Sequence, residues 1–512
     1  MDTKALRQKV LDLAIRGKLV PQDTNDEPAS VLLERIRQQK QQMVKDGKLK
    51  AKDIKNDTII FVGEDNLHYE KFADGSVKCI EDEIPFELPD GWAWARFSTI
   101  TINRDSERKP ISSSQRTGVE KIYDYYGASG KIDKIDKYIF CERLLLIGED
   151  GANLVTRSKP IAFFAEGLYW VNNHAHCIDS PDKLLLEYLC FYINAISLEK
   201  YVTGSAQPKM TQDNMNSILI PLPPYNEQKR LSQHLDEIMA MVDRIEIGKI
   251  ESIELISKAK SKILDLAIRG QLVPQDPDDE PASVLLERIR AEKEELIKQG
   301  KLKRDKKESV IFRGEDNSYY EKMADGKLHC LDDQLPFELP DGWEWCNLSM
   351  IGTTNIGLTY RPTDIEPGGI MVLRSCNIVN DQVDLSDLVR VKTTVRENQF
   401  AQKNDILICA RNGSRSLVGK CALIPDLGEP ASFGAFMAIY RTEYFEFIVH
   451  YLRSSFFKSV FDDSNSTAIN QLTQDMLKRA IVPLPPLSEQ RKIVEAIGAM
   501  LFELNQIEKS LS

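Results

Sequence analysis

Apolar residues recur at helical spacing through the middle of the chain. The apolar positions are Leu231, Leu235, Ile238, Val242, Ile245, Ile256, Ala259, Ile263 and Leu266. They step by three or four residues, with one step of eleven after Ile245, which predicts one coiled-coil helix over about 227–269 with a local change of supercoil. Both ends of the chain repeat parts of this pattern. We therefore expect terminal helices that pack antiparallel against the central helix.

Short apolar runs separated by Gly, Asn, Ser and Asp replace the helical spacing on either side of this helix. Runs such as 161–164 and 406–409 predict short strands. A helical stretch follows in each region, at 182–200 and at 445–460. These two regions are therefore expected to fold as α/β domains.

Three blocks of sequence occur twice. The paired blocks are 11–40 with 264–293, 61–94 with 312–345, and 220–231 with 482–493. The first pair is identical at about 25 of 30 positions, which excludes chance. Two segments between the repeated blocks, 96–205 (the first insert) and 347–467 (the second insert), show no convincing similarity. The chain is therefore two copies of one scaffold that carry different inserts.

A repeat period near 250 residues is too long for a solenoid and favours duplication with pseudo-twofold symmetry. The predicted fold class is α+β, with two α/β domains separated by a pair of long antiparallel coiled-coil helices. The expected segments are an N-terminal helical region at 1–58, a first α/β domain at 59–225, a central coiled-coil region at 226–309, a second α/β domain at 310–487 and a C-terminal helix at 488–512. Four tryptophans near the domain boundaries, Trp92, Trp94, Trp343 and Trp345, are expected to be core anchors.

Composition excludes a disordered or fibrous protein, because 42% of the 512 residues are hydrophobic and 28% are charged. No apolar run approaches the roughly 18 residues of a membrane helix, and the first residues lack the apolar core of a signal peptide. A cytoplasmic protein without membrane contact is expected, and its nine cysteines, which form no C-x-x-C pair, are expected to be reduced.

The net charge of −11 argues at first against a nucleic-acid partner. Most of that charge lies in the acidic stretches 64–90 and 315–341, however, whereas both inserts are close to neutral.

Basic, amide and hydroxyl side chains gather in polar, turn-rich stretches of the inserts. Arg pairs with guanine and Asn or Gln with adenine, and Lys neutralises phosphates, so these stretches are candidates for DNA contact. The candidates in and just after the first insert are Arg104, Lys109, Gln115, Arg116, Lys131, Arg157, Lys159, Asn172, Asn173 and Lys209. Those in the second insert are Tyr360, Arg361, Arg374, Ser375, Arg411, Asn412, Ser414, Arg415 and Lys420. Ordinary solvated loops explain each residue equally well, and a hairpin turn would explain Asn412-Gly413.

Sequence signatures of catalysis are missing from the chain. It contains no Walker G-x-x-x-x-G-K-[ST], no G-x-G-x-x-G after a strand and no H-E-x-x-H. Pro223-Pro224-Tyr225 is similar to part of an amino-methyltransferase motif, but Leu222 stands where the essential Asn or Asp should be, so a helix lead-in is favoured. His174 and His176 could share one strand face, but no second ligand pair is evident, and structural histidines are favoured.

The repeated blocks resemble the specificity subunit of type I restriction-modification enzymes. The stretch VLDLAIRGKLVPQ from Val10, LPDGW before each insert, and LPPYNEQ or LPPLSEQ after each insert carry this resemblance, which covers the whole chain. The stretches 167–177, 411–420 and 432–441 also resemble parts of the family's target recognition domains. Because those domains vary greatly, individual contacts transfer poorly.

The resemblance implies a non-catalytic subunit whose two target recognition domains, within 59–225 and 310–487, each bind half of a bipartite, asymmetric site in double-stranded DNA. Two methyltransferase (modification) subunits carrying S-adenosylmethionine would dock on the conserved helices and methylate adenine at N6. Restriction subunits using ATP and Mg would add translocation and cleavage. No cofactor is expected in this chain itself.

Two alternatives belong to other classes. A coiled-coil adaptor would bind proteins through its inserts, and selective, salt-dependent DNA binding would exclude it. A self-sufficient methyltransferase would have to bind the cofactor alone, and the missing cofactor motifs count against it.

Overall fold

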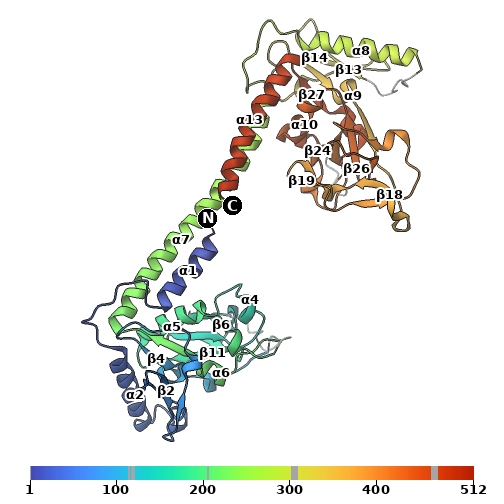
Figure 1. Cartoon of the computed structure of the whole chain (residues 1–512). Helices are drawn as coiled ribbons and strands as arrows, with labels where there is room; N and C mark the ends of the chain where they lie inside the picture. The colour runs from blue at the N-terminus through green and yellow to red at the C-terminus, as the bar shows by residue number, and fades with distance from the viewer. Residues whose placement is uncertain are drawn as a thin grey trace. The chain divides into compact units, whose positions relative to one another are not determined.

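The chain folds into two compact units, Met1–Gly248 and Lys249–Ser512 (Figure 1). The computed structural model describes residues 2–112, 116, 121–204, 207–300, 309–462 and 471–511. Each unit contains part of the central helix, a terminal helix, a charged helix, a three-stranded sheet and an insert built from strands and short helices. Within these described stretches no helix is long and apolar enough to cross a membrane.

A single helix, α7 (Tyr225–Ile268), occupies the middle of the chain, which confirms the prediction from apolar spacing. In the first unit it packs with α1 (Thr3–Ile15), which lies alongside it in Figure 1. Arg7 near the start of α1 pairs with Asp243, whereas Gln22, beyond the end of α1, contacts the first turn of α7. The two helices therefore run antiparallel, as predicted.

The second unit contains the corresponding helix pair. The C-terminal helix α13 (Leu487–Leu511) shares an apolar core with the end of α7, where Ile493 and Ile268 are both buried. Farther along α13, Glu508 pairs with Lys260, which precedes Ile268 in α7. These two contacts make the pair antiparallel, and the predicted terminal helix is confirmed.

In the first unit, two paired strands of the scaffold flank the insert. The antiparallel pair β4 (Ala93–Arg96) and β12 (Leu219–Leu222) brackets the insert. The scaffold also contains α2 (Ala29–Lys45) and the antiparallel strands β1 (Ile59–Val62), β2 (His68–Lys71) and β3 (Val77–Cys79). The sheets have the orders β5-β11-β8-β9 and β10-β6-β7, with strands β5 (Ile102–Asn103), β6 (Tyr123–Gly127), β7 (Gly130–Ile135), β8 (Leu144–Gly148), β9 (Ala162–Ala165), β10 (Tyr169–Val171) and β11 (Ala175–Asp179). The helices are α3 (Phe97–Ile100), α4 (Asn153–Thr156), α5 (Lys183–Ala195) and α6 (Gln212–Asn216).

The second unit uses the same bracket, β16 (Glu344–Asn347) paired with β27 (Ile481–Leu484). Its scaffold contains α8 (Ala282–Lys298), β13 (Ser309–Arg313), β14 (Tyr319–Met323) and β15 (Leu328–Cys330). One sheet of its insert has the order β17-β26-β23-β24-β20-β19, with strands β17 (Thr353–Ile356), β19 (Ile378–Val379), β20 (Gln382–Val383), β23 (Ile406–Cys409), β24 (Cys421–Leu423) and β26 (Met437–Arg441). The other has the order β21-β18-β25-β22, with strands β18 (Ile365–Leu373), β21 (Val389–Val391), β22 (Phe400–Ala401) and β25 (Ala431–Phe433). The helices are α9 (Leu348–Ile351), α10 (Phe445–Arg453), α11 (Ser455–Asp462) and α12 (Gln474–Arg479).

A buried glutamate holds each helix pair to the start of its insert. Glu227, in the first turn of α7, is 1% exposed and accepts hydrogen bonds from Trp92 Nε1 at 3.0 Å and Gln22 Nε2 at 2.9 Å. In the second unit Glu489 accepts from Trp343 Nε1 at 2.9 Å and Gln275 Nε2 at 3.2 Å. All four tryptophans are buried, so the prediction of core anchors is confirmed.

A lysine on each charged helix contacts the main chain where the insert begins. Lys40 of α2 is 1% exposed, pairs with Asp57 at 2.7 Å, and donates to the carbonyls of Ser98 at 2.9 Å and Thr99 at 3.3 Å. In the second unit Lys293 of α8 donates to the carbonyl of Ser349 at 3.1 Å. Both lysines therefore hold a short helix, α3 or α9, through atoms that every residue type provides.

Candidate nucleic-acid interface

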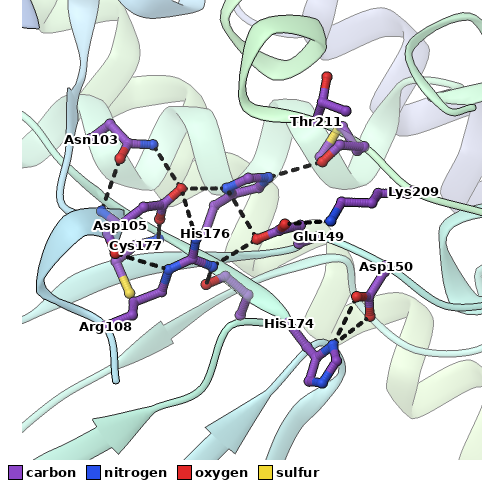
Figure 2. A network of polar contacts seen from close by, with 12 residues as sticks. Asn103, Asp105, Arg108, Glu149, Asp150, His174, His176, Cys177, Lys209 and Thr211 are labelled. Carbon is purple, nitrogen blue, oxygen red and sulfur yellow. Dashed lines mark hydrogen bonds and ion pairs between the residues drawn. The ribbon is translucent and has the colours of Figure 1, made fainter. Parts of the chain in front are cut away.

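A buried network of charged residues organises the loops of the first insert (Figure 2). His176 of β11 is 1% exposed, and its Nδ1 lies 2.6 Å from Asp105 Oδ2 while its Nε2 lies 3.0 Å from the Met210 carbonyl. Arg108 Nη1 donates to Glu149 at 2.7 Å and Arg108 Nη2 lies 3.2 Å from Asp105. The network joins four segments, 103–108, 149–150, 174–177 and 209–210, that are distant in sequence.

The carboxylates in this network remain ionised because cationic groups surround them. Burial opposes ionisation of Asp105, but the contact with His176 and the charge of Arg108 lower its pKa. Glu149 follows the same pattern, since hydrogen bonds from Arg108 and Lys209 lower its pKa against the effect of burial. Ligand atoms of Asp105, Glu149 and His176 lie within 4.8 Å of one another, a spacing that could suit a metal. Arg108 and Lys209 already neutralise these carboxylates, which favours the structural role predicted for His176.

Replacing His176 with Leu should destabilise the first insert by about 3 kcal/mol, because it removes the contact of the largely buried Asp105 carboxylate with the imidazole. Hydrogen exchange of the full chain, followed by mass spectrometry of peptides from 100–110 and 170–180, would measure this loss. The matched control is His174→Leu. The exposed imidazole of His174 pairs with Asp150 at 2.7 Å and with no other side chain among the described residues, so the control should cost under about 1 kcal/mol. Equal losses in the two variants would contradict a structural role for the buried network.

Two arginines of the first insert that were predicted to contact DNA form ion pairs or hydrogen bonds within the protein. Arg104 pairs with Glu107, Glu142 and Asp179, so its guanidinium connects three segments. Arg157 donates to the carbonyls of Ile193 and Asn194 near the end of α5, where a cation is favoured by the helix dipole.

Other candidates of the first insert are buried or paired to different degrees. Asn172 is buried, and its Oδ1 accepts from the backbone of His174. Arg116 lies 4.5 Å from the ring centroid of Tyr125 and pairs with Asp133. Two lysines form ion pairs at the surface, Lys131 with Asp124 and Lys209 with Glu149. Lys109, Lys159 and Asn173 are exposed, and Gln115 lies outside the described residues.

The second insert brings several predicted residues together at one pocket. Tyr360, Arg374 and Ser375 line a pocket of about 500 Å³ beside Phe436, where β18 ends and β26 is about to begin. Arg374 donates to the carboxylate of Asp387 at 2.9 Å, and its buried Nε has no acceptor among the described residues. A buried N–H without an acceptor is costly, so this guanidinium is able to gain from a further hydrogen bond.

Arg411 and Asn412, from another segment, contact two residues that line this pocket. The guanidinium of Arg411 lies 5.4 Å from the ring centroid of Phe436, and Asn412 Nδ2 donates to Ser375 Oγ at 3.4 Å. Neither Asn412 nor Gly413 has the positive φ that a two-residue type I′ hairpin turn needs, so that alternative is wrong. Three predicted residues therefore line one pocket, and Arg411 and Asn412 each contact a residue of its lining. Arg361, Ser414 and Arg415 are exposed, while Lys420 is half-buried.

Phe436 is a member of this site that the sequence analysis missed. Its side chain is 61% exposed, which is unusual for a phenylalanine and places an apolar surface beside the guanidinium groups. The available signal was its position after Gly434 and Ala435, just before an apolar strand. Guanidinium, amide and hydroxyl groups next to such a surface can hydrogen-bond to a base edge and contact a thymine methyl group.

Comparison with known proteins identifies the family. The family model described as type I restriction modification DNA specificity domain matches residues 100–255 and again 340–511. Two Escherichia coli proteins align over nearly the whole chain. The type I restriction enzyme EcoAI specificity subunit is 28% identical over 98% of this chain and 90% of its own, and the EcoEI specificity subunit is 27% identical over 99% and 90%.

A solved structure adds evidence for the fold. It is described as concerning complex assembly and conformational transition of the type I R-M system, and one of its chains superposes with a TM-score of 0.50 and 16% identity over 83% of this chain and 94% of that chain. At this identity the likeness concerns the fold alone, whereas the duplicated match of the family model covers more than half of the sequence. The chain therefore belongs to the type I restriction-modification DNA specificity family and contains the family's domain twice.

Proposed function

We propose that this chain is the non-catalytic DNA sequence-specificity subunit of a type I restriction-modification complex. The observation that carries the proposal is the contrast between two scaffolds with the same anchors, Trp92 with Glu227 and Trp343 with Glu489, and two inserts with different sheets. Closely similar scaffolds suit two copies of one partner, whereas different inserts suit two different half-sites. Each insert would bind one half of an asymmetric, bipartite site in double-stranded DNA.

Catalysis in this proposal belongs to partner chains. Two modification subunits would bind S-adenosylmethionine and methylate adenine at N6, and restriction subunits would use ATP and Mg for translocation and cleavage. This chain would supply the positions of those subunits on the DNA and would need no cofactor of its own. With a net charge of −11, the chain alone should bind DNA weakly, and partner chains should provide much of the positive field around the duplex.

Methylome sequencing of a host that carries the complete system tests this function. Two domains on one face of B-DNA need half-site centres about one helical turn, 10–10.5 base pairs, apart. With half-sites of 3–5 base pairs, a spacer of roughly 5–8 base pairs is expected between two unlike half-sites. A continuous or palindromic methylated sequence would contradict the proposal.

Replacing Arg374 with Ala should weaken selective DNA binding by about 1–3 kcal/mol, or roughly 5- to 150-fold, if its guanidinium contacts a base edge. Binding of the complex with the modification subunit to its methylated sequence and to a scrambled duplex would measure this effect. The control variant is Arg390→Ala, because Arg390 pairs with Glu429 at 2.6 Å and is not part of the pocket. An equal loss for both variants, or an equal loss on the scrambled duplex, would show that Arg374 does not contribute to selectivity.

A further inference from the structure

Each scaffold exposes an aromatic row on its three-stranded sheet. In the first unit Phe61, Tyr69 and Cys79 are direct cross-strand neighbours on β1, β2 and β3, so their side chains share one face. Phe61 is 41% exposed and stacks on Tyr69 with ring centroids 5.9 Å apart, and Cys79 is an exposed free thiol. The opposite face contributes Ile60 to the core around Trp94.

The second unit repeats this row at the corresponding positions. Phe312, Tyr320 and Cys330 are direct neighbours on β13, β14 and β15. Phe312 is 38% exposed and stacks on Tyr320 with ring centroids 6.1 Å apart, and Cys330 is exposed. We use the term aromatic face for these two rows, Phe61-Tyr69-Cys79 and Phe312-Tyr320-Cys330.

Some positions in the two sheets and their turns differ between the copies, whereas the aromatic face is the same in both. Val62 corresponds to Arg313, Leu67 to Ser318 and Ser76 to Lys327, although these sheets have the same strands and register. Solvent-exposed aromatic surface favours nonspecific association. A sheet face that stayed uncovered would therefore not be expected to keep its aromatic side chains. The presence of the same row in both copies favours a similar covering surface at each sheet.

Charge around the aromatic face restricts the partner. Glu64 and Asp65 follow β1 and are exposed, and Glu315 and Asp316 occupy the same places after β13. The acidic turn at Asp74 likewise recurs at Asp325. A complementary partner surface therefore has an apolar strip bordered by lysine or arginine, which double-stranded DNA does not offer. The family model matches 100–255 and 340–511, so neither sheet lies within the matched domain.

We propose that the aromatic face of each scaffold is a docking site for the modification subunit, with one subunit bound at each three-stranded sheet (Figure 1). The inference rests on the proposed function for the presence of two modification subunits. Two copies of one partner explain why two sheets with the same row lie in one chain. A subunit bound at each sheet would cover its Phe, Tyr and Cys side chains, so two bound subunits would bury both thiols.

Thiol alkylation tests this interface with groups that the chain already contains. The chain alone and its complex with the modification subunit are treated with N-ethylmaleimide in the absence of DNA, and each cysteine is followed by peptide mass spectrometry. Alkylation of Cys79 and Cys330 should slow at least tenfold in the complex. Cys141 and Cys376, which are exposed in the two inserts, are internal controls and should keep their rates.

Substitutions test the same face by stoichiometry. Phe61→Ser or Phe312→Ser should each leave one strong site, so native mass spectrometry should show one modification subunit per chain in place of two. The double variant should lower the affinity at least tenfold. The matched control is Val62→Arg, which introduces the residue found at the equivalent position of the second copy and should leave binding unchanged.

Several outcomes would overturn the interface. Unchanged alkylation of Cys79 and Cys330 in the complex would do so, as would protection only after a restriction subunit is added. Protection in the chain alone at rising concentration would assign the face to self-association. If the complex methylates a bipartite site while both thiols stay fully reactive, only the interface fails. If the complex shows no sequence selectivity, the proposed function itself fails.

Discussion

A chain in which residues 96–205 are replaced by the corresponding segment of a relative with another specificity should direct methylation to a hybrid site, with one half changed and the other half retained. The physical reason is the bracket of β4 and β12, which are paired in register from Arg96 with Leu219 to Ala93 with Leu222. The insert begins at the last residue of β4 and ends before β12, so a replacement enters between these two paired strands. The second unit has its own bracket and should be unaffected.

Methylome sequencing of the host measures this result directly. The reciprocal control replaces residues 347–467 and should change the opposite half of the site. Both variants should keep the full chain's methylation activity on their new sites, because the scaffold and its helix pairs are intact. A change in both halves of the methylated site after one replacement, or loss of selectivity in both variants, would show that the inserts do not recognise the two half-sites independently.

Replacing Trp92 with Ala should cost the first unit about 3–5 kcal/mol, the range for large-to-small substitutions of a buried aromatic. Trp92 is 8% exposed and packs in the main core of the first unit. Its loss also removes one of two donors to Glu227 and leaves that buried carboxylate with Gln22. Urea unfolding of the full chain, with peptides of the first unit followed by hydrogen exchange, would measure the change.

The Trp92 variant should also respond to pH. Burial raises the pKa of Glu227, while the hydrogen bonds from Gln22 and Trp92 oppose that rise. A carboxyl group whose pKa is higher in the folded state contributes less stability as the pH rises from its ordinary value through the raised one. Without Trp92 the pKa should rise further, so the deficit of the variant should be larger at pH 8 than at pH 5.

Trp94→Ala is the matched control for this prediction. Trp94 is 3% exposed, lies two residues away, and its Nε1 has no acceptor among the described residues. Its replacement should cost a similar amount from lost packing, but the deficit should not depend on pH over this range. A pH-independent deficit for the Trp92 variant would contradict the role of its indole in holding the Glu227 carboxylate.

The helical scaffold was predictable because its signal is periodic and repeated. Apolar steps of three and four residues located α7, and the matching terminal segments indicated the antiparallel pairs. The anchor of Glu227 and Trp92 was less accessible, since nothing in LPPYNEQ distinguishes a buried glutamate from a solvated one at the start of a helix.

The candidate DNA-contact residues were harder to predict, because local composition does not show which groups a side chain contacts in the folded protein. Arg104 and Arg411 stand in similar polar stretches, yet Arg104 pairs with carboxylates from three segments and Arg411 lies over Phe436 at the pocket. The difference comes from contacts between segments that are far apart in sequence. The sequence pattern therefore predicts the polar loops, but only the fold shows which of their residues pair within the protein and which are exposed.

The contacts of Lys40 and Lys293 bear on how new specificities arise. Each lysine holds the first short helix of its insert through main-chain carbonyls, those of Ser98 and Thr99 in one unit and Ser349 in the other. These hydrogen bonds use only main-chain atoms of the insert, so they do not depend on the side chains of the incoming segment. Genetic recombination could thus exchange whole inserts between genes without matched changes in the scaffold, which makes each insert an interchangeable part in evolution.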